Sequence, residues 1–245
     1  MNQSKNIQYW VTQSNILNIF SFDIQPYLEL LTFEKNATIC SEGEPFQMLY
    51  FLVEGRAKLY ITHTNGKVSM INFLTAPNLI GEMELIGAQE FSHGIIALTE
   101  CKLLAIPLYK LKDRLLSDSK FLLFLCKFLS SKTLKNTKKF SQNINYTLKE
   151  RLAYFILLST DVNGDKVTPS YEDTNTSFSI YKERHTEVAE YLGVSYRHLL
   201  YVFAEFCEKL ILRKTSKGYL ITDYSALLTL AADIQKEHEM LDFRI

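Results

Sequence analysis

The sequence has few of the residues that build disulfide scaffolds, zinc ribbons or membrane spans. Its 245 residues include only 4 cysteines, 5 prolines and 1 tryptophan. The cysteines are Cys40, Cys101, Cys126 and Cys207, and they form no C-x-x-C pair. This scatter argues against a disulfide framework, a zinc ribbon and a clustered iron–sulfur centre. The most apolar run, residues 121–129, is far shorter than the roughly 20 residues of a membrane-spanning helix, so we expect no contact with a membrane.

The chain also lacks an excess of charge of either sign. Its 27 Lys and Arg residues balance 27 Asp and Glu residues, so binding to DNA would require a local basic patch. With 47% hydrophobic and 22% charged residues the composition is that of a globular protein, which argues against wholesale disorder. Residues 1–10 lack the apolar segment of a secretory signal. We therefore expect a reducing, cytoplasmic setting in which the cysteines are mostly buried small hydrophobic residues.

Glycine-containing turns at short intervals divide residues 32–106 into β-rich runs. Partial alternation of apolar and polar residues predicts four strands: Met48–Val53, Ala57–Thr62, Val68–Leu74 and Ile95–Leu98. Asn65-Gly66 between two of these runs predicts a type I′ hairpin turn. Many short strands with regular turns favour an antiparallel β-roll of the jelly-roll type, so the chain as a whole is predicted to be an α+β protein.

A long helix is predicted from about Ser119 to Phe140. Its first half is apolar almost all the way round, and such a helix has to be buried on more than one side. One side can pack on the β-roll, and a two-fold related copy of the helix is the simplest cover for the other side, although another part of the same chain would also serve. The predicted dimer contacts recur at helical spacing: Phe121, Leu122, Leu125, Phe128 and Leu129. The stretch Asn143–Asn145 is predicted as a hinge.

Residues His185 to Ala204 (HTEVAEYLGVSYRHLLYVFA) meet the requirements of a helix-turn-helix. Ala189 is the small residue where the helices cross, Gly193 tolerates the positive φ of the tight turn, and Ser195 can cap the second helix. The apolar face of that helix recurs at helical spacing: Leu199, Val202, Phe203, Phe206 and Leu210. The sequence therefore predicts two short packed helices here.

The opposite face of the second helix carries groups that suit DNA. Arg197 can form a bidentate hydrogen bond with guanine in the major groove. Tyr196, His198 and Tyr201, together with Ser195, suit phosphate oxygens or thymine methyl groups.

A basic hairpin is predicted directly after this helix. Strands at Ile211–Arg213 and Tyr219–Ile221 flank a tip that contains Lys214 and Lys217. Such a hairpin beside a recognition helix is a wing that can contact phosphates. Residues Ser195–Leu220 carry five basic and two acidic side chains, a net charge of +3, so we predict weak non-specific DNA binding with a shallow salt dependence.

This order of elements resembles the Crp/Fnr family of bacterial transcription regulators, over roughly Ile16 to Ile221. The resemblance rests on SEGEPFQMLYFLVEGRAKLYITHTNGK, NLIGEMELI and LTECKLLAIP in the roll and on EVAEYLGVSYRHLLYVFAEFCEKLIL in the C-terminal part. Within it, SYRHLLYV is most similar to the YeiL-type branch. We divide the chain into a sensor roll (1–117), a dimerisation helix with a hinge (118–145) and a winged helix-turn-helix (146–245).

The resemblance implies a homodimer joined along the long helix. It also implies that the dimer binds double-stranded DNA at two inverted half-sites, whose spacing follows the two-fold symmetry of the protein. We expect RNA polymerase as a further partner.

The predicted effector pocket departs from the family pattern. Members that bind cyclic AMP have a Gly-Glu pair followed by an arginine-containing cluster that holds the phosphate. Gly81 and Glu82 match the pair, but the cluster position carries Ser92 and His93 and no arginine. Without a fixed cation a phosphate would lose charge-assisted hydrogen bonds worth about 1.5–3 kcal/mol each. We therefore predict that cyclic AMP is not the effector, and we predict no cofactor.

Two other functions are compatible with parts of the sequence. A cupin-like metal enzyme with an appended helical domain needs a His-x-His pair, which the 5 histidines do not provide. Glu82 and Glu84 would share a face on a strand and resemble a catalytic carboxylate pair. The chain has no G-x-S-x-G, H-E-x-x-H, P-loop or G-x-G-x-x-G motif, so we predict no enzyme and no metal site. The other alternative is a dimeric sensor that contacts only proteins.

Overall fold

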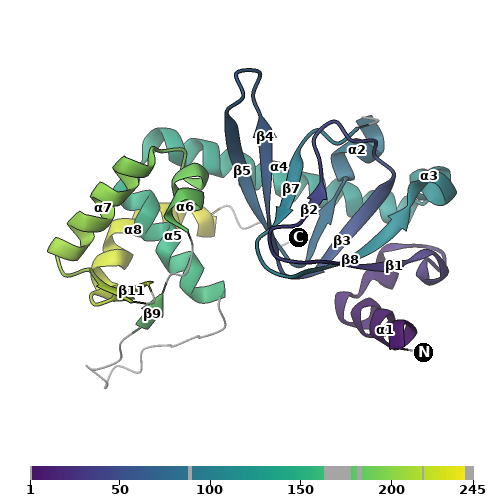
Figure 1. Cartoon of the computed structure of the whole chain (residues 1–245), viewed down its shortest axis with the longest axis horizontal. Coiled ribbons are helices and arrows are strands. Elements are labelled where there is room, and N and C mark those ends of the chain that lie inside the picture. Colours follow the sequence, from purple (N-terminus) through teal and green to yellow (C-terminus); the bar gives the residue numbers. More distant parts are fainter. Residues whose placement is uncertain (1, 88–89, 163–177, 181–183, 217, 241–245) are drawn as a thin grey trace. The chain divides into compact units, whose positions relative to one another are not determined.

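The structure is a computed structural model that describes residues 2–87, 90–162, 178–180, 184–216 and 218–240. The chain divides into two compact units, residues 1–134 and 135–245, whose helices and strands are labelled in Figure 1. Helix α4 (Ser119–Asn145) begins in the first unit and ends in the second.

The first unit is built on two antiparallel four-stranded sheets, which confirms the predicted roll and the α+β class. One sheet has the order β1 (Glu29–Phe33), β8 (Cys101–Pro107), β3 (Met48–Glu54) and β6 (Asn78–Ile80). The other has the order β2 (Thr38–Cys40), β7 (Gly94–Ala97), β4 (Arg56–Thr62) and β5 (Val68–Thr75). Between the sheets lies an apolar core that includes Leu52, Leu59, Leu74, Ile95 and Leu103.

The β4–β5 hairpin differs from the predicted type I′ turn. A type I′ turn requires a positive φ at both central residues. Gly66 has a φ of 77°, whereas Asn65 is not among the residues with positive φ. The loop runs over five residues, and the amide of Gly66 donates to the carbonyl of His63 at 2.8 Å. Glycine is therefore used to close a longer turn and does not form the centre of a two-residue one.

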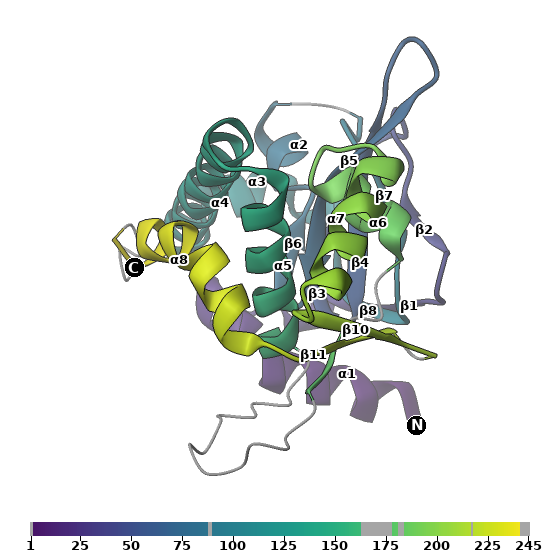
Figure 2. The same ribbon diagram turned by 90° about the vertical axis from the view of Figure 1, so that its left-hand side faces the viewer.

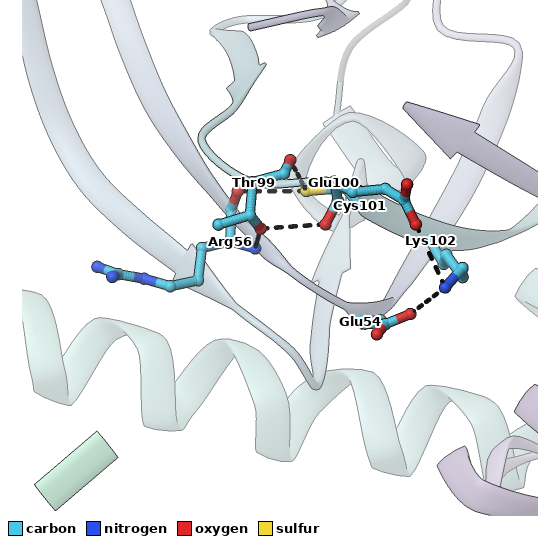
Figure 3. A network of polar contacts seen from close by, with 6 residues as sticks. All are labelled: Glu54, Arg56, Thr99, Glu100, Cys101 and Lys102. Atoms are coloured by element: carbon cyan, nitrogen blue, oxygen red, sulfur yellow. Dashed lines mark hydrogen bonds and ion pairs between the residues drawn. The ribbon is translucent and has the colours of Figure 1, made fainter. Parts of the chain in front are cut away.

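A polar network fixes the turn between β3 and β4 against the start of β8 (Figure 3). The amide of Arg56 donates to the hydroxyl of Thr99 at 2.9 Å, and the thiol of Cys101 donates to the carbonyl of Arg56 at 3.2 Å. The ammonium group of Lys102 forms ion pairs with Glu54 and Glu100. These contacts join two chain segments that are more than 40 residues apart, so they hold the roll closed at this end.

Helices cover the sheet that contains β3 and β8. They are α1 (Asn2–Ser14), the 3-10 helices η1 (Ile16–Ile19) and η2 (Gln25–Tyr27), α3 (Leu108–Ser117) and the first half of α4. A further short helix, α2 (Glu82–Gly87), follows β6. Phe121 of α4 is fully buried and stacks on Phe20 with ring centroids 5.3 Å apart. A second apolar core therefore lies between this sheet and the helices.

Asp118 caps α4 and holds it to the preceding chain. One carboxylate oxygen accepts from the amides of Lys120 (3.0 Å) and Phe121 (3.3 Å), and the other accepts from the amide of Ser21 (2.8 Å). Burial alone would raise the pKa of Asp118, but these hydrogen bonds outweigh it and lower the pKa below 3.8. The charged form is thus the one that stabilises the start of α4.

Besides the end of α4, the second unit contains four helices and a three-stranded sheet among the described residues (Figure 2). The helices are α5 (Leu148–Val162), α6 (His185–Tyr191), α7 (Tyr196–Glu208) and α8 (Tyr224–Met240). The sheet has the order β10 (Leu212–Thr215), β11 (Gly218–Ile221) and β9 (Phe178–Ile180). Helix α5 packs between α8 and α7, so the helix that follows the wing completes the core of this unit.

The break between α4 and α5 lies slightly later than the predicted hinge. Asn143–Asn145 are the last turn of α4, and the chain leaves the helix at Tyr146 and Thr147. The carboxylate of Glu150 accepts from the amide (2.7 Å) and the hydroxyl (2.8 Å) of Thr147. The amide of Glu150 in turn donates to the hydroxyl of Thr147 at 3.5 Å. The two residues therefore form a capping box, which begins α5 and sets the position of the break.

Candidate DNA interface and effector pocket

The corner of the helix-turn-helix has the geometry that its residues predict. Gly193 adopts a φ of 67°, and the amide of Val194 donates to the carbonyl of Ala189 at 2.9 Å. The hydroxyl of Ser195 accepts from the amide of His198 at 3.2 Å and so caps α7. The motif was predictable because each of these requirements is local.

One face of α7 is buried and the other is open. Leu199, Val202, Phe203 and Phe206 are each at most 1% exposed. Leu210, which the apolar spacing assigned to the same face, is instead 75% exposed, because α7 ends at Glu208 and Leu210 has a φ of 55°.

The residues of α7 and its cap that are predicted to contact DNA lie on the open side. Ser195, Tyr196, Arg197, His198 and Tyr201 are exposed, with Tyr201 at 67%. They occupy the cap and the first two turns of α7, the part of a recognition helix that meets base edges in a major groove.

An aromatic cluster joins the wing to the recognition helix. The ring of Tyr219 on β11 stacks on Phe203 of α7 with centroids 4.7 Å apart, and His185 at the start of α6 lies 4.8 Å from Phe203. Burial, and secondly the charge of Lys214, lower the pKa of His185, which favours the neutral form of its ring. His185 was not predicted as part of this cluster, because nothing in the residues around it distinguishes it from an exposed residue at the start of a helix.

Lys214 is exposed on β10, and Lys217 lies outside the described residues. Not every cation of the predicted patch is available to DNA. The ammonium groups of Lys149 (2.7 Å) and Lys209 (2.9 Å) both pair with the carboxylate of Glu205 on α7. Their hydrogen bonds lower the pKa of Glu205. Of the predicted patch, Lys209 is therefore paired within the chain and is less available to a phosphate.

Three of the four predicted effector residues, Gly81, Glu82 and His93, line one pocket in the roll, and Ser92 is hydrogen-bonded to Glu84, which also lines it. Gly81 directly follows β6 and has a φ of 93°. Any larger residue would clash here, because a Cβ at this position would lie 2.3 Å from the ring of Phe46. Glu82 follows at the start of α2 and is 2% exposed. Its carboxylate accepts a hydrogen bond from the ammonium group of Lys132, which comes from α4.

Glu82 and Glu84 do not form the pair expected for a strand. Both belong to the first turn of α2, where residues two apart point in different directions. While Glu82 pairs with Lys132, Glu84 accepts from the amide of Ser92 at 3.1 Å and from its hydroxyl. The same hydroxyl lies 2.7 Å from Nδ1 of His93. The two carboxylates therefore have separate partners, and the arrangement is not a carboxylate pair for acid–base catalysis.

The space left in this pocket is small. The cavity lined by Gly81, Glu82, His93 and Lys132 has a volume of about 30 Å³, roughly the share of one water in the liquid. A nucleotide does not fit without rearrangement. Lys132 was missed as a pocket residue. The sequence offered one indication of this role: the spacing of Lys132 from Phe121 and Leu125 places all three residues on the same side of one helix.

The two buried cysteines, Cys40 and Cys101, lack the features of reactive thiols. Cys40 and Cys101 are both free thiols inside the roll. Burial, followed by the charges of Glu84 and Glu44, raises the pKa of Cys40, and burial also raises the pKa of Cys101. Reactive cysteines need the opposite, a lowered pKa and access, so packing is the role that the structure supports.

The structure corrects part of the predicted dimer surface. Phe121 and Leu125 are at most 1% exposed within a single chain, packed in the core between the roll and the helices, so they have no surface to offer a partner. Phe128 and Leu129 are half-buried against the same core, and Leu122 is half-buried. The apolar residue most exposed in the first half of α4 is Leu123, at 59%.

Contacts within the second unit connect the end of α4 to the helix-turn-helix. One nitrogen of Arg151 donates to the side-chain oxygen of Asn143 (2.5 Å) and to the carbonyl of Leu192 (2.7 Å), directly before the turn. The ammonium group of Lys139 lies 3.7 Å from the ring centroid of Tyr191, and burial lowers its pKa to about 8. The last turns of α4 are thus attached to the corner of the motif.

Among the described residues, no group of His, Cys, Asp and Glu is arranged to hold a metal ion. Within the same part of the chain, none of the helices has the length and apolar character needed to span a bilayer.

Comparison with known proteins gives consistent results. The family model of the cyclic nucleotide-binding domain matches residues 30–118. The chain is 40% identical to the regulatory protein YeiL of Escherichia coli O157:H7 over 229 residues, which cover 94% of this chain and 97% of that protein. It is also 26% identical over 130 residues to the global nitrogen regulator of a Nostoc species, covering 52% of this chain and 58% of that protein.

Solved structures share the fold. A transcriptional regulator of the Crp/Fnr family from Eubacterium rectale matches with a TM-score of 0.69 and 17% identity, over 85% of this chain and 92% of that one. A Crp/Fnr regulator from Thermus thermophilus matches with a TM-score of 0.64 and 21% identity, over 83% and 98%. With the roll, the winged helix-turn-helix and a 40% identical relative along almost its whole length, this chain belongs to the Crp/Fnr family of transcriptional regulators, which are not enzymes.

Proposed function

We propose that this regulator is a homodimer that reads an inverted-repeat operator with one α7 helix from each protomer. The observation that carries the proposal is the exposed face of α7, on which Tyr196, Arg197, His198 and Tyr201 surround a capped helix start. Arg197 is assigned to a guanine, and the neighbouring rings are assigned to phosphates and thymine methyl groups. Lys214 on the wing is assigned to a phosphate.

The partner surface that we propose is the exposed side of α4, here called the partner face: Leu122, Leu123, Cys126, Leu129, Thr133 and Phe140. Leu122, Cys126, Leu129 and Thr133 follow one another at intervals of four and three residues, the spacing of a two-helix seam. Phe140 comes seven residues later and is 67% exposed. These residues lie beside the buried side of the helix, so α4 can cover the roll and a partner helix at the same time.

We propose that the signal, if it enters at the roll pocket, is not cyclic AMP. The pocket lacks an arginine, its carboxylates are already paired with Lys132 and Ser92, and its volume is about 30 Å³. A signal that shifts α4 would reach the recognition helix through Asn143 and Arg151. We also propose contact with RNA polymerase, on the basis of family membership.

The proposed function is tested by selecting bound fragments from genomic DNA with the purified full chain. We expect a common sequence made of two inverted half-sites. Enrichment of no sequence, with or without added cell extract, would instead favour a sensor that contacts only proteins.

The partner face predicts a specific cross-link. Cys126 is exposed on α4, and in a two-fold pair of parallel helices it faces its own copy closely enough for a disulfide. Mild oxidation, which removes the two thiol hydrogens, is expected to give a covalent dimer on a non-reducing gel. The variant Cys126→Ser should give none, whereas the matched variant Cys207→Ser should behave as the wild type. Equal cross-linking in Cys126→Ser would show that the subunits meet elsewhere.

A further inference from the structure

The first unit contains a second, larger cavity that the proposed function does not use. It has a volume of about 240 Å³ and is lined mainly by residues of three elements, with Ser14 of α1 and Asn78 and Leu79 of β6 beside them. Ile16 and Ile19 come from η1, Phe51 and Val53 from β3, and Phe124 and Phe128 from α4. The space is partly open to solvent, and an apolar hollow of this size leaves its lining without the close packing that apolar side chains usually have.

The lining of this apolar cavity excludes charged ligands. None of its lining residues is Lys, Arg, His, Asp or Glu. Its two polar side chains are bonded locally, since the hydroxyl of Ser14 donates to the carbonyl of Val11 (3.3 Å) and the side-chain oxygen of Asn78 accepts from the amide of Leu79 (3.0 Å). A charged molecule would lose its hydration without gaining a partner.

The apolar cavity is separate from both sites described above. It shares only Leu79 with the roll pocket. Its two α4 residues also lie away from the line of Leu122 and Cys126, because Phe124 and Phe128 follow them by two residues, which is a rotation of about 200° around a helix.

We propose that the apolar cavity is a binding site for an uncharged apolar molecule of about the size of a two-ring aromatic compound. An apolar cavity of about 150 Å³ is large enough to bind benzene, and this one is larger. A molecule in it would contact β3 and α4 at once, and so fix how the helix packs on the roll. The binding itself requires no DNA. Only its consequence for operator affinity rests on the proposed function.

Naphthalene and 2-naphthoate are matched probes, because they differ only by a carboxylate. We expect naphthalene to bind the full chain saturably, with one molecule per chain, in a ligand-detected NMR titration without DNA. We expect 2-naphthoate to bind at least 10-fold more weakly. Absence of saturable naphthalene binding would overturn the proposal, and equal binding of the two probes would overturn the ligand class.

Cavity-filling variants locate the site. Ile19→Trp and Val53→Trp each place a large ring in the cavity and are expected to abolish naphthalene binding. Ile86→Trp makes the same kind of change at a side chain that is 63% exposed and should leave binding unchanged. Circular dichroism shows which variants fold, and retained binding in a folded filling variant would contradict the proposal. Because no DNA is present, a failure of the proposed operator recognition would not alter these results.

Discussion

Replacing Arg197 with alanine is expected to lower operator affinity by about 5- to 150-fold, which corresponds to the 1–3 kcal/mol of a bidentate arginine–guanine contact. Arg197 is exposed at the second position of α7, where side chains reach base edges. Affinity for random DNA should change much less, because that binding depends on phosphates. Fluorescence anisotropy with operator and random duplexes, at one fixed salt concentration, measures both values.

The matched control is Lys214→Ala on the wing. A phosphate contact carries no sequence information, so this variant should weaken binding to operator and random DNA by similar factors and make the salt dependence shallower. If Arg197→Ala behaves in the same way as Lys214→Ala, Arg197 is a phosphate ligand and the assignment of base reading to it is wrong.

Replacing Lys132 with alanine is expected to lower the free energy of unfolding of the roll by about 2–3 kcal/mol. The side chain of Glu82 is only 3% exposed, so the change leaves a buried carboxylate without its cation. The expected loss lies below the 3–5 kcal/mol of a fully buried pair, because the side chain of Lys132 is 23% exposed and water screens part of the interaction. The chain has 1 tryptophan, and Trp10 packs against the core of the first unit, so its fluorescence in urea follows this unit.

A double-mutant cycle separates the ion pair from other effects. Glu82→Gln combined with Lys132→Ala removes the buried charge and should recover much of the lost stability. Lys127→Ala is the matched control, since Lys127 is exposed on the same helix and its loss should cost little. If Lys132→Ala and Lys127→Ala have equal unfolding free energies, the ion pair does not stabilise the roll.

Local chemistry explains why the helix-turn-helix was predicted closely. The positive φ of Gly193, the cap at Ser195 and the small Ala189 act within a few residues of one another, and each has a recognisable residue type. The four predicted strands of the roll also match strands of the structure, because the alternation of core-facing and solvent-facing side chains along a strand is visible in the sequence.

Contacts between distant segments explain what the sequence did not show. Lys132 belongs to the roll pocket only because α4 packs across the roll, which places it beside Glu82, 50 residues earlier. Helix α1 was missed because its early residues are largely polar, whereas Val11 becomes buried through tertiary packing. The break before α5 is the exception, because Thr147 and Glu150 form a T-x-x-E capping box, a helix-start signal that can be recognised in the sequence.

The dimer face shows the limit of periodicity. Helical spacing identified α4 as apolar on more than one side, but it could not say which side covers the roll. Phe121 and Leu125 are both buried within one chain, so the spacing combined two surfaces with different roles. Only the packing of α4 on the roll separates them and leaves the partner face.

The most direct test of two-fold recognition is the spacing of the half-sites in the selected operator. Recognition helices of a dimer reach successive major grooves on one side of the duplex, about 10–10.5 base pairs apart. Inserting five base pairs between the half-sites turns one of them to the opposite side and should lower the affinity to that of a single half-site, whereas inserting ten should restore part of it. Equal affinity for the original and the five-base-pair operator would contradict a dimer that binds with its paired α7 helices.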